Sequence, residues 1–262
     1  MEPKSVVVTG ATGFIGQELV HRLWQAGIGV IGITRTRAEV MPFVPFIMDL
    51  LDESEPFADP PAGTLLGLIH LAGHAPGSTL SPVALHETGT ARVVELAKLW
   101  NIPKVIYVSA QGATMSAPTA FQQSKWLAEE IVAHSGMNFV ILRPHLVWGT
   151  SSRTSEKLER LGRLPNVKVR PIHVADVAET LIRSLWLDRV DGKRYEMAGP
   201  QLMPLESLVE GASRSFMRRR RHVTLRDLDA WGILTPRHNR ADGAWVSDFG
   251  ILPRPVLSTR TH

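Results

Sequence analysis

The chain has 262 residues, of which 44% are hydrophobic, enough for one large α/β domain with a modest appendage. It contains no cysteine, which excludes disulfides, a cysteine-ligated zinc site and a thiol nucleophile. The net charge of +4 and the pI near 9.7 are compatible with an anionic ligand but say little about the fold. No run approaches the roughly 18 apolar residues of a membrane span. We expect no signal peptide, because the first strand is predicted to begin at about Ser5. We therefore expect a cytoplasmic protein.

The first predicted element is a strand over residues 6–8, three β-branched residues that suit a buried position. Glycines at positions 10, 13 and 16 follow it, and an apolar helical stripe begins at Phe14 and extends to Ala26. Gly10 suits a tight turn, Gly13 a close approach of a phosphate, and Gly16 a close packing of helix on strand. Strand, glycine turn and helix together predict a site where a pyrophosphate meets a helix N-terminus.

A second strand is predicted over residues 28–34. Folds that bind NAD usually place an acidic residue at the end of this strand, to accept a hydrogen bond from the ribose 2′-hydroxyl. This chain has Arg35 and Arg37 there instead. A guanidinium would attract a 2′-phosphate, so NADP(H) is favoured over NAD(H). The alternative is that both arginines are solvated loop charges.

A third strand is predicted over residues 44–48, and it ends at Asp49. The Asp49 carboxylate could accept a hydrogen bond from an adenine amino group, or it could cap the following turn. The remaining predicted elements of this half are strands at residues 65–71, 104–109 and 139–142, and helices at residues 88–100 and 120–135.

The pattern loosens after Gly149. It predicts a short strand at residues 167–172, a helix at 174–187, a strand at 194–198 and a helix at 204–216. From His222 onward no periodicity is clear. The alternation of strands and helices predicts a Rossmann-like, doubly wound parallel sheet. We expect a dinucleotide-binding domain over residues 1–150 and a small, partly irregular C-terminal portion over residues 151–262 that contacts substrate or partner.

Five segments resemble the extended and atypical branches of the short-chain dehydrogenase/reductase superfamily. They are TGATGFIG at residues 9–16, Leu71-Ala72-Gly73, YVSAQGA at residues 107–113, SKWLAE at residues 124–129 and RPHLVWG at residues 143–149. GKRYEMAGP at residues 192–200 fits as well. The loop at residues 109–113 is similar to that of the group related to the NAD(P)H-binding accessory subunit of respiratory complex I.

The resemblance implies a dinucleotide site and a reaction centre. The expected cofactor contacts lie at the ends of the predicted strands and the start of two helices. They are Gly10, Thr12, Gly13, Phe14, Ile15, Arg35, Asp49, Leu71, Ala72, Gly73, Ser109, Lys125, Pro144 and Val147. The resemblance assigns catalytic roles to Lys125, which would hold the nicotinamide ribose, and to Ser109, which would donate a hydrogen bond. No metal site is expected, because no HExxH motif or comparable cluster occurs.

One position departs from the family pattern. The family's active site has a tyrosine four residues before the lysine, and here that residue is Phe121. A phenyl ring has no proton to give, so ordinary carbonyl reduction lacks its general acid, a contribution typically worth ~10²–10⁴ in rate. The chain has two tyrosines, Tyr107 and Tyr195, and neither obviously replaces it.

Two functions stay open from the sequence. The first is a protein that holds NADP(H) with weak or no ordinary dehydrogenase activity, in a structural, sensing or assembly role. The second is an active oxidoreductase or nucleotide-sugar epimerase that uses another acid, such as His74, His145 or water.

One run of basic residues suggests possible binding partners. Arg218 to Arg221 are four consecutive arginines, which suit a solvated surface, an acidic protein or anionic lipid, or the diphosphate of a sugar nucleotide. No nucleic-acid-binding module surrounds them, so nucleic-acid binding is not expected. The resemblance also implies a homodimer through the helices at residues 88–100 and 120–135.

Overall fold

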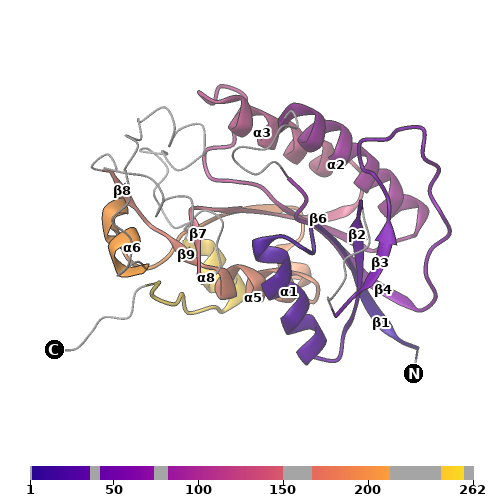
Figure 1. Ribbon diagram of the computed structural model, residues 1–262, viewed down its shortest axis with the longest axis horizontal. Helices are drawn as coiled ribbons and strands as arrows, with labels where there is room; N and C mark the ends of the chain where they lie inside the picture. Colours follow the sequence, from indigo (N-terminus) through magenta and orange to yellow (C-terminus); the bar gives the residue numbers. More distant parts are fainter. Residues whose placement is uncertain (1, 36–41, 74–81, 150–166, 213–242, 257–262) are drawn as a thin grey trace.

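A seven-stranded sheet forms the centre of the computed structural model, with strand order β10-β6-β5-β4-β1-β2-β3 (Figure 1). Its strands are β1 (Lys4–Thr9), β2 (Gly29–Thr34), β3 (Val44–Ile47), β4 (Thr64–His70), β5 (Lys104–Val108), β6 (Asn138–Pro144) and β10 (Lys193–Met197). The structure describes residues 2–35, 42–73, 82–149, 167–212 and 243–256. Every strand pairing in this sheet is parallel. The sheet confirms the predicted Rossmann-like, doubly wound class.

The strand order fixes where a ligand can bind. The chain starts in the middle of the sheet at β1, moves outward through β2 and β3, and then returns to the other side of β1 with β4. In open parallel sheets the crevice for a ligand lies beyond the carboxyl ends of the strands, at the point where the order reverses. That point is the gap between β1 and β4, where the glycine-rich turn begins.

Helices cover both faces of the sheet. One face carries α1 (Phe14–Gln25), α5 (Val174–Ser184) and α8 (Gly243–Phe249), and the other carries α2 (Pro82–Leu99) and α3 (Ala120–Ala133) (Figure 1). In β1, Val6 and Val8 pack toward the first face, and Val7 packs toward the second. This double burial explains why the first strand is an unbroken β-branched run without polar alternation.

Two predicted elements differ from the structure. Helix α2 begins at Pro82, six residues before the predicted start at Thr88. Proline suits the first position of a helix because its missing N–H has no partner there, so Pro82 is a start signal in its own right. The strand predicted at residues 167–172 is two short strands, β8 (Lys168–Val169) and β9 (Ile172–His173), in separate small sheets. Pro171 lies between them and has no N–H for a ladder.

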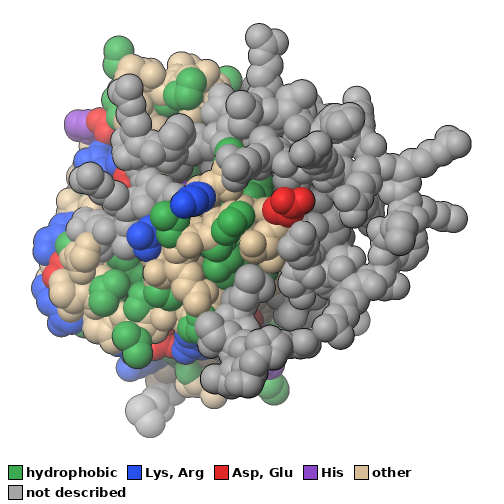
Figure 2. Space-filling view, turned by 90° about the vertical axis from the view of Figure 1, so that its left-hand side faces the viewer, with side chains coloured by type: hydrophobic (Ala, Val, Ile, Leu, Met, Phe, Trp, Pro, Cys, Tyr) green, Lys and Arg blue, Asp and Glu red, His purple; other side chains and the backbone are tan. Residues whose placement is uncertain are grey.

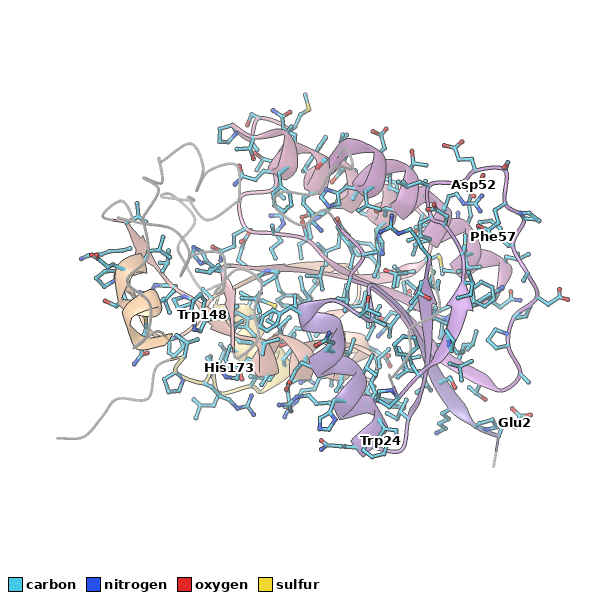
Figure 3. The ribbon with its side chains drawn as sticks, in the orientation of Figure 1. Glu2, Trp24, Asp52, Phe57, Trp148 and His173 are labelled. Atoms are coloured by element: carbon cyan, nitrogen blue, oxygen red, sulfur yellow. The ribbon has the colours of Figure 1, made fainter. Side chains whose placement is uncertain are left out.

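The small sheets pair these strands with two others. β9 runs parallel to β7 (Val147–Trp148), and β8 runs antiparallel to β11 (Met203–Pro204). Trp148 and His173 are paired in the first ladder and lie close together in Figure 3. His173 also caps α5, because its Nδ1 accepts a hydrogen bond of 3.1 Å from the backbone N–H of Ala175. The start of α5 is thereby fixed beside the segment that follows β6.

The C-terminal region contributes to the main core. Helix α8 has only seven residues, too few for a periodicity to predict it, yet Trp245 and Phe249 are completely buried. Asp248 accepts hydrogen bonds from the Tyr195 hydroxyl (2.7 Å) and the Lys193 ammonium (3.2 Å) of β10. A 3-10 helix, η1 (Asp188–Val190), precedes β10, and α6 (Leu205–Ala212) follows it. Residues 213–216, the rest of the helix predicted at 204–216, lie outside the described residues.

The division of the chain at residue 150 stays a prediction. The central sheet itself takes its edge strand β10 from beyond that position.

Figure 2 views the end of the molecule that carries α6, where hydrophobic side chains gather on the described part of the surface next to positively charged ones. Within the described ranges, none of the helices is both long enough and apolar enough to span a bilayer.

Candidate dinucleotide site and reaction centre

The glycine-rich turn has the backbone geometry that its sequence predicts. Gly10 has a φ of +70°, and a Cβ there would lie 2.8 Å from the backbone nitrogen of Ala72. A Cβ on Gly16 would lie 2.2 Å from the carbonyl oxygen of Gly10. Gly10 therefore makes the turn and lets the loop after β4 approach closely, and Gly16 lets α1 pack against the turn. Contact of these residues with a dinucleotide stays a prediction.

The start of α1 offers donors for an anion. Gly13 is the N-cap residue, no side chain caps the helix, and its first turn contains no acidic residue. The first backbone N–H groups of a helix have no partner within it, and they carry a partial positive charge. Thr12 and Gly13 are exposed here, while Phe14 and Ile15 are half-buried. This arrangement suits the pyrophosphate predicted at this turn.

Two residues proposed for the adenosine end lie at the ends of β2 and β3. Arg35 directly follows β2 and is exposed, whereas Arg37 lies outside the described residues. Asp49 follows β3 and is half-buried, and its Oδ1 accepts a hydrogen bond of 3.0 Å from the backbone N–H of Leu51. The turn-capping alternative for Asp49 is therefore realised. A contact of Asp49 with adenine stays a prediction.

A buried hydrogen-bonded chain holds the loop after β4 in place. Thr9 Oγ1 accepts hydrogen bonds from the backbone N–H groups of Leu71 (3.2 Å) and Ala72 (3.0 Å). It lies 2.6 Å from His70 Nδ1, and His70 Nε2 lies 3.1 Å from Thr90 Oγ1. Burial lowers the pKa of His70 to about 3, with a smaller effect of the nearby positive Lys125. His70 is therefore a neutral structural residue, as its place in the strand predicts.

Ser109 lies at the carboxyl end of β5. It is buried, and within the described part of the chain its hydroxyl has no hydrogen-bond partner. Its backbone N–H donates to Leu142 O at 2.8 Å, which ties β5 to β6 at this edge. A buried hydroxyl without a partner is costly, and a bound ligand would satisfy it. Pro144 is buried and Val147 half-buried in the segment at the end of β6.

Lys125 projects from α3 toward the same strand ends. Its Nζ donates a hydrogen bond of 2.9 Å to Val108 O and lies 4.9 Å from the centre of the Tyr107 ring. Burial lowers the pKa of Lys125 to about 8, and the negative charge of Glu129 opposes that shift. A buried ammonium with a lowered pKa near a crevice is a candidate functional group.

Neither tyrosine can supply the proton that Phe121 lacks. Tyr107 is fully buried, and burial raises the pKa of its hydroxyl well above the usual value. Tyr195 donates its hydroxyl proton to Asp248 on the other face of the sheet. His145 is buried, and burial, followed by the positive Arg170, lowers its pKa to about 4, so it is neutral at pH 7. His74, the other histidine considered, lies outside the described residues.

His86 is a member of the reaction centre that sequence reasoning missed. It is fully buried on α2, and its ring meets the Phe121 ring edge-on with centroids 5.6 Å apart. Its Nδ1 lies 2.8 Å from Ser124 Oγ, one residue before Lys125. The helix predicted from Thr88 leaves position 86 outside it. The Ser81-Pro82 start signal would have brought His86 into the helix.

Two of the resembling segments are joined by a buried ion pair. Arg143, from the segment at 143–149, contacts Glu129, from the segment at 124–129, through Nε at 2.8 Å and Nη2 at 2.6 Å. The Glu129 side chain is completely buried, and Arg194 of β10 lies 3.3 Å from it. Arg143 also reaches Glu196 at 3.0 Å. These contacts link α3, β6 and β10 behind Lys125.

We expect Glu129→Gln to lower the free energy of unfolding by about 3–5 kcal/mol, because it removes the completely buried carboxylate that Arg143 and Arg194 both contact. Glu130→Gln is the matched control, since Glu130 is partly exposed and pairs with Arg194 on the surface. The control should cost under ~1 kcal/mol. Urea unfolding of both variants measures the difference. Equal effects would contradict the importance assigned to burial.

The strand ends therefore hold the parts that a nicotinamide dinucleotide needs. An uncapped helix start suits its pyrophosphate, a bare Gly10 lets the loop after β4 close against the turn, and Ser109 presents a buried hydroxyl in need of a partner. The residues present fit the group. Among the described residues, no cluster of histidines and carboxylates could hold a metal ion.

The comparisons with known proteins agree with this geometry. A family model described as NAD(P)H-binding matches residues 10–186. The mitochondrial NADH-ubiquinone oxidoreductase 40 kDa subunit of Neurospora crassa is 25% identical over 84% of this chain and 62% of its own length. The mitochondrial NADH dehydrogenase (ubiquinone) 1 alpha subcomplex subunit 9 of Arabidopsis thaliana is 28% identical over 78% of this chain and 56% of its own length. The chain thus spans under two thirds of these relatives.

Solved structures show the same fold. The UDP-glucose 4-epimerase of Thermotoga maritima with UDP-glucose superposes with a TM-score of 0.73 at 14% identity, over 95% of this chain and 94% of its own. WbmH of Bordetella bronchiseptica, in complex with NAD⁺, gives 0.69 at 18% identity over 98% and 95%. Identities this low carry the fold alone.

The class that fold and site define is the Rossmann-type nucleotide-binding protein. Within it, the chain belongs to the NAD(P)H-binding family. Its similarity to mitochondrial NADH-ubiquinone oxidoreductase subunits supports the resemblance to the atypical short-chain dehydrogenase/reductase group related to the complex I accessory subunit. Its cofactor is a nicotinamide dinucleotide.

Proposed function

We propose that this protein binds NADP(H) and has weak or no ordinary dehydrogenase activity, because Phe121 stands where the family's proton-donating tyrosine would be. The observation that supports this proposal best is that Phe121 and a retained, buried Lys125 lie on the same helix. The chain keeps the group expected to hold the nicotinamide ribose and lacks the group expected to protonate a substrate. Both tyrosines are engaged or buried elsewhere.

In the bound state the dinucleotide would lie along the strand ends. Gly10, Thr12, Gly13, Phe14 and Ile15 would hold the pyrophosphate at the start of α1. Leu71, Ala72 and Gly73 would lie against its riboses, and Ser109 and Lys125 would donate hydrogen bonds at the nicotinamide end. Asp49 would serve the adenine, and Pro144 and Val147 the nicotinamide. The dinucleotide, when bound, supplies a hydride; the chain's own residues bind it and exclude water.

Arg35 is the residue that we propose selects NADP(H). Its exposed guanidinium directly follows β2, where an adenosine ribose would lie. Fluorescence titration of the purified protein should show tighter binding of NADPH than of NADH. Arg35→Ala should weaken NADPH binding by about 10–100-fold, as expected for a lost hydrogen bond to a charged group.

The same substitution should leave NADH binding within about twofold, since NADH has no 2′-phosphate. Lys4→Ala is a matched control, because Lys4 is exposed at the opposite, amino-terminal end of β1. Equal losses for NADH and NADPH would refute the assigned preference. No binding of either nucleotide at millimolar concentration would overturn the proposed function itself.

The relatives favour an assembly role for such a protein. Those named above are a 40 kDa subunit and a subcomplex subunit of the NADH-ubiquinone enzyme. We propose a nucleotide-holding subunit or assembly factor that contacts another protein, in the cytoplasm. The arginines at 218–221 and the homodimer predicted through α2 and α3 stay predictions, and the former lie outside the described residues.

A further inference from the structure

A buried arginine on α2 holds the loop that follows β3. Arg92 is only 7% exposed, and its two terminal nitrogens donate to backbone carbonyls of that loop, Nη2 to Glu55 O at 2.6 Å and Nη1 to Glu53 O at 3.3 Å. The guanidinium carbon also lies 4.4 Å from the centre of the Phe57 ring. Figure 3 shows this loop beside α2, with Phe57 labelled. One side chain therefore contacts the loop at three of its residues.

Packing alone does not account for an arginine at this position. In the described part of the chain Nε has no hydrogen-bond partner, and the two terminal nitrogens donate to neutral carbonyls rather than to carboxylates. Burying a charge in this way is costly. A methionine would fill similar space without that cost. What the guanidinium adds is a rigid pair of donors for the backbone of the loop.

The loop transmits this attachment to Asp49. Glu55 Oε2 accepts a hydrogen bond of 2.9 Å from the backbone N–H of Asp49, and Asp49 Oδ1 accepts one of 3.0 Å from the N–H of Leu51. Arg92 is bonded to the backbone carbonyl of Glu55, the same residue whose carboxylate holds Asp49. The position of the Asp49 carboxylate therefore depends on a loop that is fixed from α2.

Asp49 has one carboxylate oxygen available for a ligand. Oδ1 is used by Leu51, and among the described residues Oδ2 makes no hydrogen bond. The preceding residue, Met48, donates its N–H to Thr34 O at 2.9 Å, which places Asp49 beside the carboxyl end of β2. The adenosine of a dinucleotide is expected at that end of the strand. A carboxylate oxygen held there can accept a hydrogen bond from the 6-amino group of adenine.

We propose that Arg92 is a positioning residue for adenine recognition: through Glu55 it holds the Asp49 carboxylate where the 6-amino group of adenine binds. The inference rests on the proposed function and deepens it, because it makes the base of the dinucleotide a selected feature. The protein should then distinguish NADPH from reduced nicotinamide hypoxanthine dinucleotide phosphate, in which an oxygen replaces the 6-amino group. A site built to accept a proton from the amino group disfavours an analogue that lacks it.

Fluorescence titration with these two dinucleotides measures the preference. The wild-type protein should bind NADPH about 10–100-fold more tightly than the hypoxanthine analogue, as expected for a hydrogen bond to a charged group. Asp49→Ala should abolish the difference. Arg92→Met, which keeps a long side chain against Phe57, should reduce it to within about threefold. Glu55→Ala should do the same, and it covers the case in which Arg92→Met fails to fold, because Glu55 is only half-buried.

Trp100→Phe is the matched control. Trp100 also joins α2 to this loop, because its Nε1–H donates to Ala58 O at 2.9 Å, but that contact lies further along the loop and does not involve Glu55 or Asp49. The control should keep the wild-type ratio of the two affinities, even where it lowers stability. A purely structural role of Arg92 would weaken both dinucleotides equally, so an unchanged ratio in Arg92→Met would overturn the proposal.

Amide hydrogen exchange in the ligand-free protein separates this inference from the proposed function. Arg92→Met should speed exchange of the Asp49 and Leu51 N–H groups by at least about tenfold, because both hydrogen bonds depend on the held loop, and Trp100→Phe should not. Unchanged protection in Arg92→Met would refute the positioning role. If neither dinucleotide binds the wild-type protein while exchange still accelerates in Arg92→Met, the proposed function fails and the coupling of Arg92 to Asp49 stands.

Discussion

Phe121→Tyr should create or strongly increase NADPH-dependent carbonyl reduction. The position is the first turn of α3, four residues before Lys125, so a tyrosine hydroxyl there would lie on the helix face that already carries the buried ammonium. A positioned general acid typically contributes ~10²–10⁴ in rate, and we expect a gain in that range. The measurement is NADPH oxidation at 340 nm with a panel of small aldehydes and ketones.

The controls isolate the acid from general loosening of the site. Phe121→Leu removes the ring without adding a proton and should show no gain. Phe121→Tyr combined with Lys125→Met should lose the gain, because the ammonium would no longer support the phenol. Strong activity of the unaltered protein would contradict the proposed loss of dehydrogenase function, and would direct attention to water or another group as the acid.

The sequence predicts the geometry of the glycine-rich turn well because that turn is built from backbone. Gly10 requires a positive φ and Gly16 requires close packing, and a glycine at each position is enough to indicate both requirements. The spacing of strand and helix places Arg35 at its strand end in the same way. Such features depend on residues that are neighbours in the sequence, so the sequence alone is enough to predict them.

The sequence predicts the reaction centre less well because side chains from distant elements meet there. His86 from α2 contacts Phe121 and Ser124 from α3, a pairing that no local pattern encodes. The missed helix α8 has the same cause. Its seven residues carry no clear stripe, and its position follows from Trp245 and Phe249 filling a space left by α5 and β10.

Arg254 shows how strongly such distant contacts can fix a chain end. Its guanidinium pairs with the completely buried carboxylate of Asp176, and its backbone N–H donates to the same carboxylate at 2.7 Å. Asp176 lies in the first turn of α5, and α5 packs beside α1. The segment after α8 is thus joined to the helices that position the glycine-rich turn.

Gly16→Ala tests that turn directly. Its Cβ would lie 2.2 Å from Gly10 O and 2.6 Å from Ala11 O, both backbone atoms that cannot move without disturbing the turn. We expect a loss of about 1–3 kcal/mol in the free energy of unfolding, as for other overpacked sites. NADPH affinity should fall at least tenfold, which corresponds to about 1.4 kcal/mol, because α1 must shift away from the strand whose loop it completes.

Gly89→Ala is the matched control, since Gly89 is also helical but a Cβ there meets only side-chain atoms at 3.6 and 3.7 Å. In a helix interior, alanine is better than glycine by roughly 0.5–1 kcal/mol, so this variant should be stabilised and bind NADPH normally. Urea unfolding and fluorescence titration of both variants separate helix propensity from packing at the turn. Unchanged NADPH affinity in Gly16→Ala would mean that the dinucleotide does not depend on the close approach of α1 to Gly10.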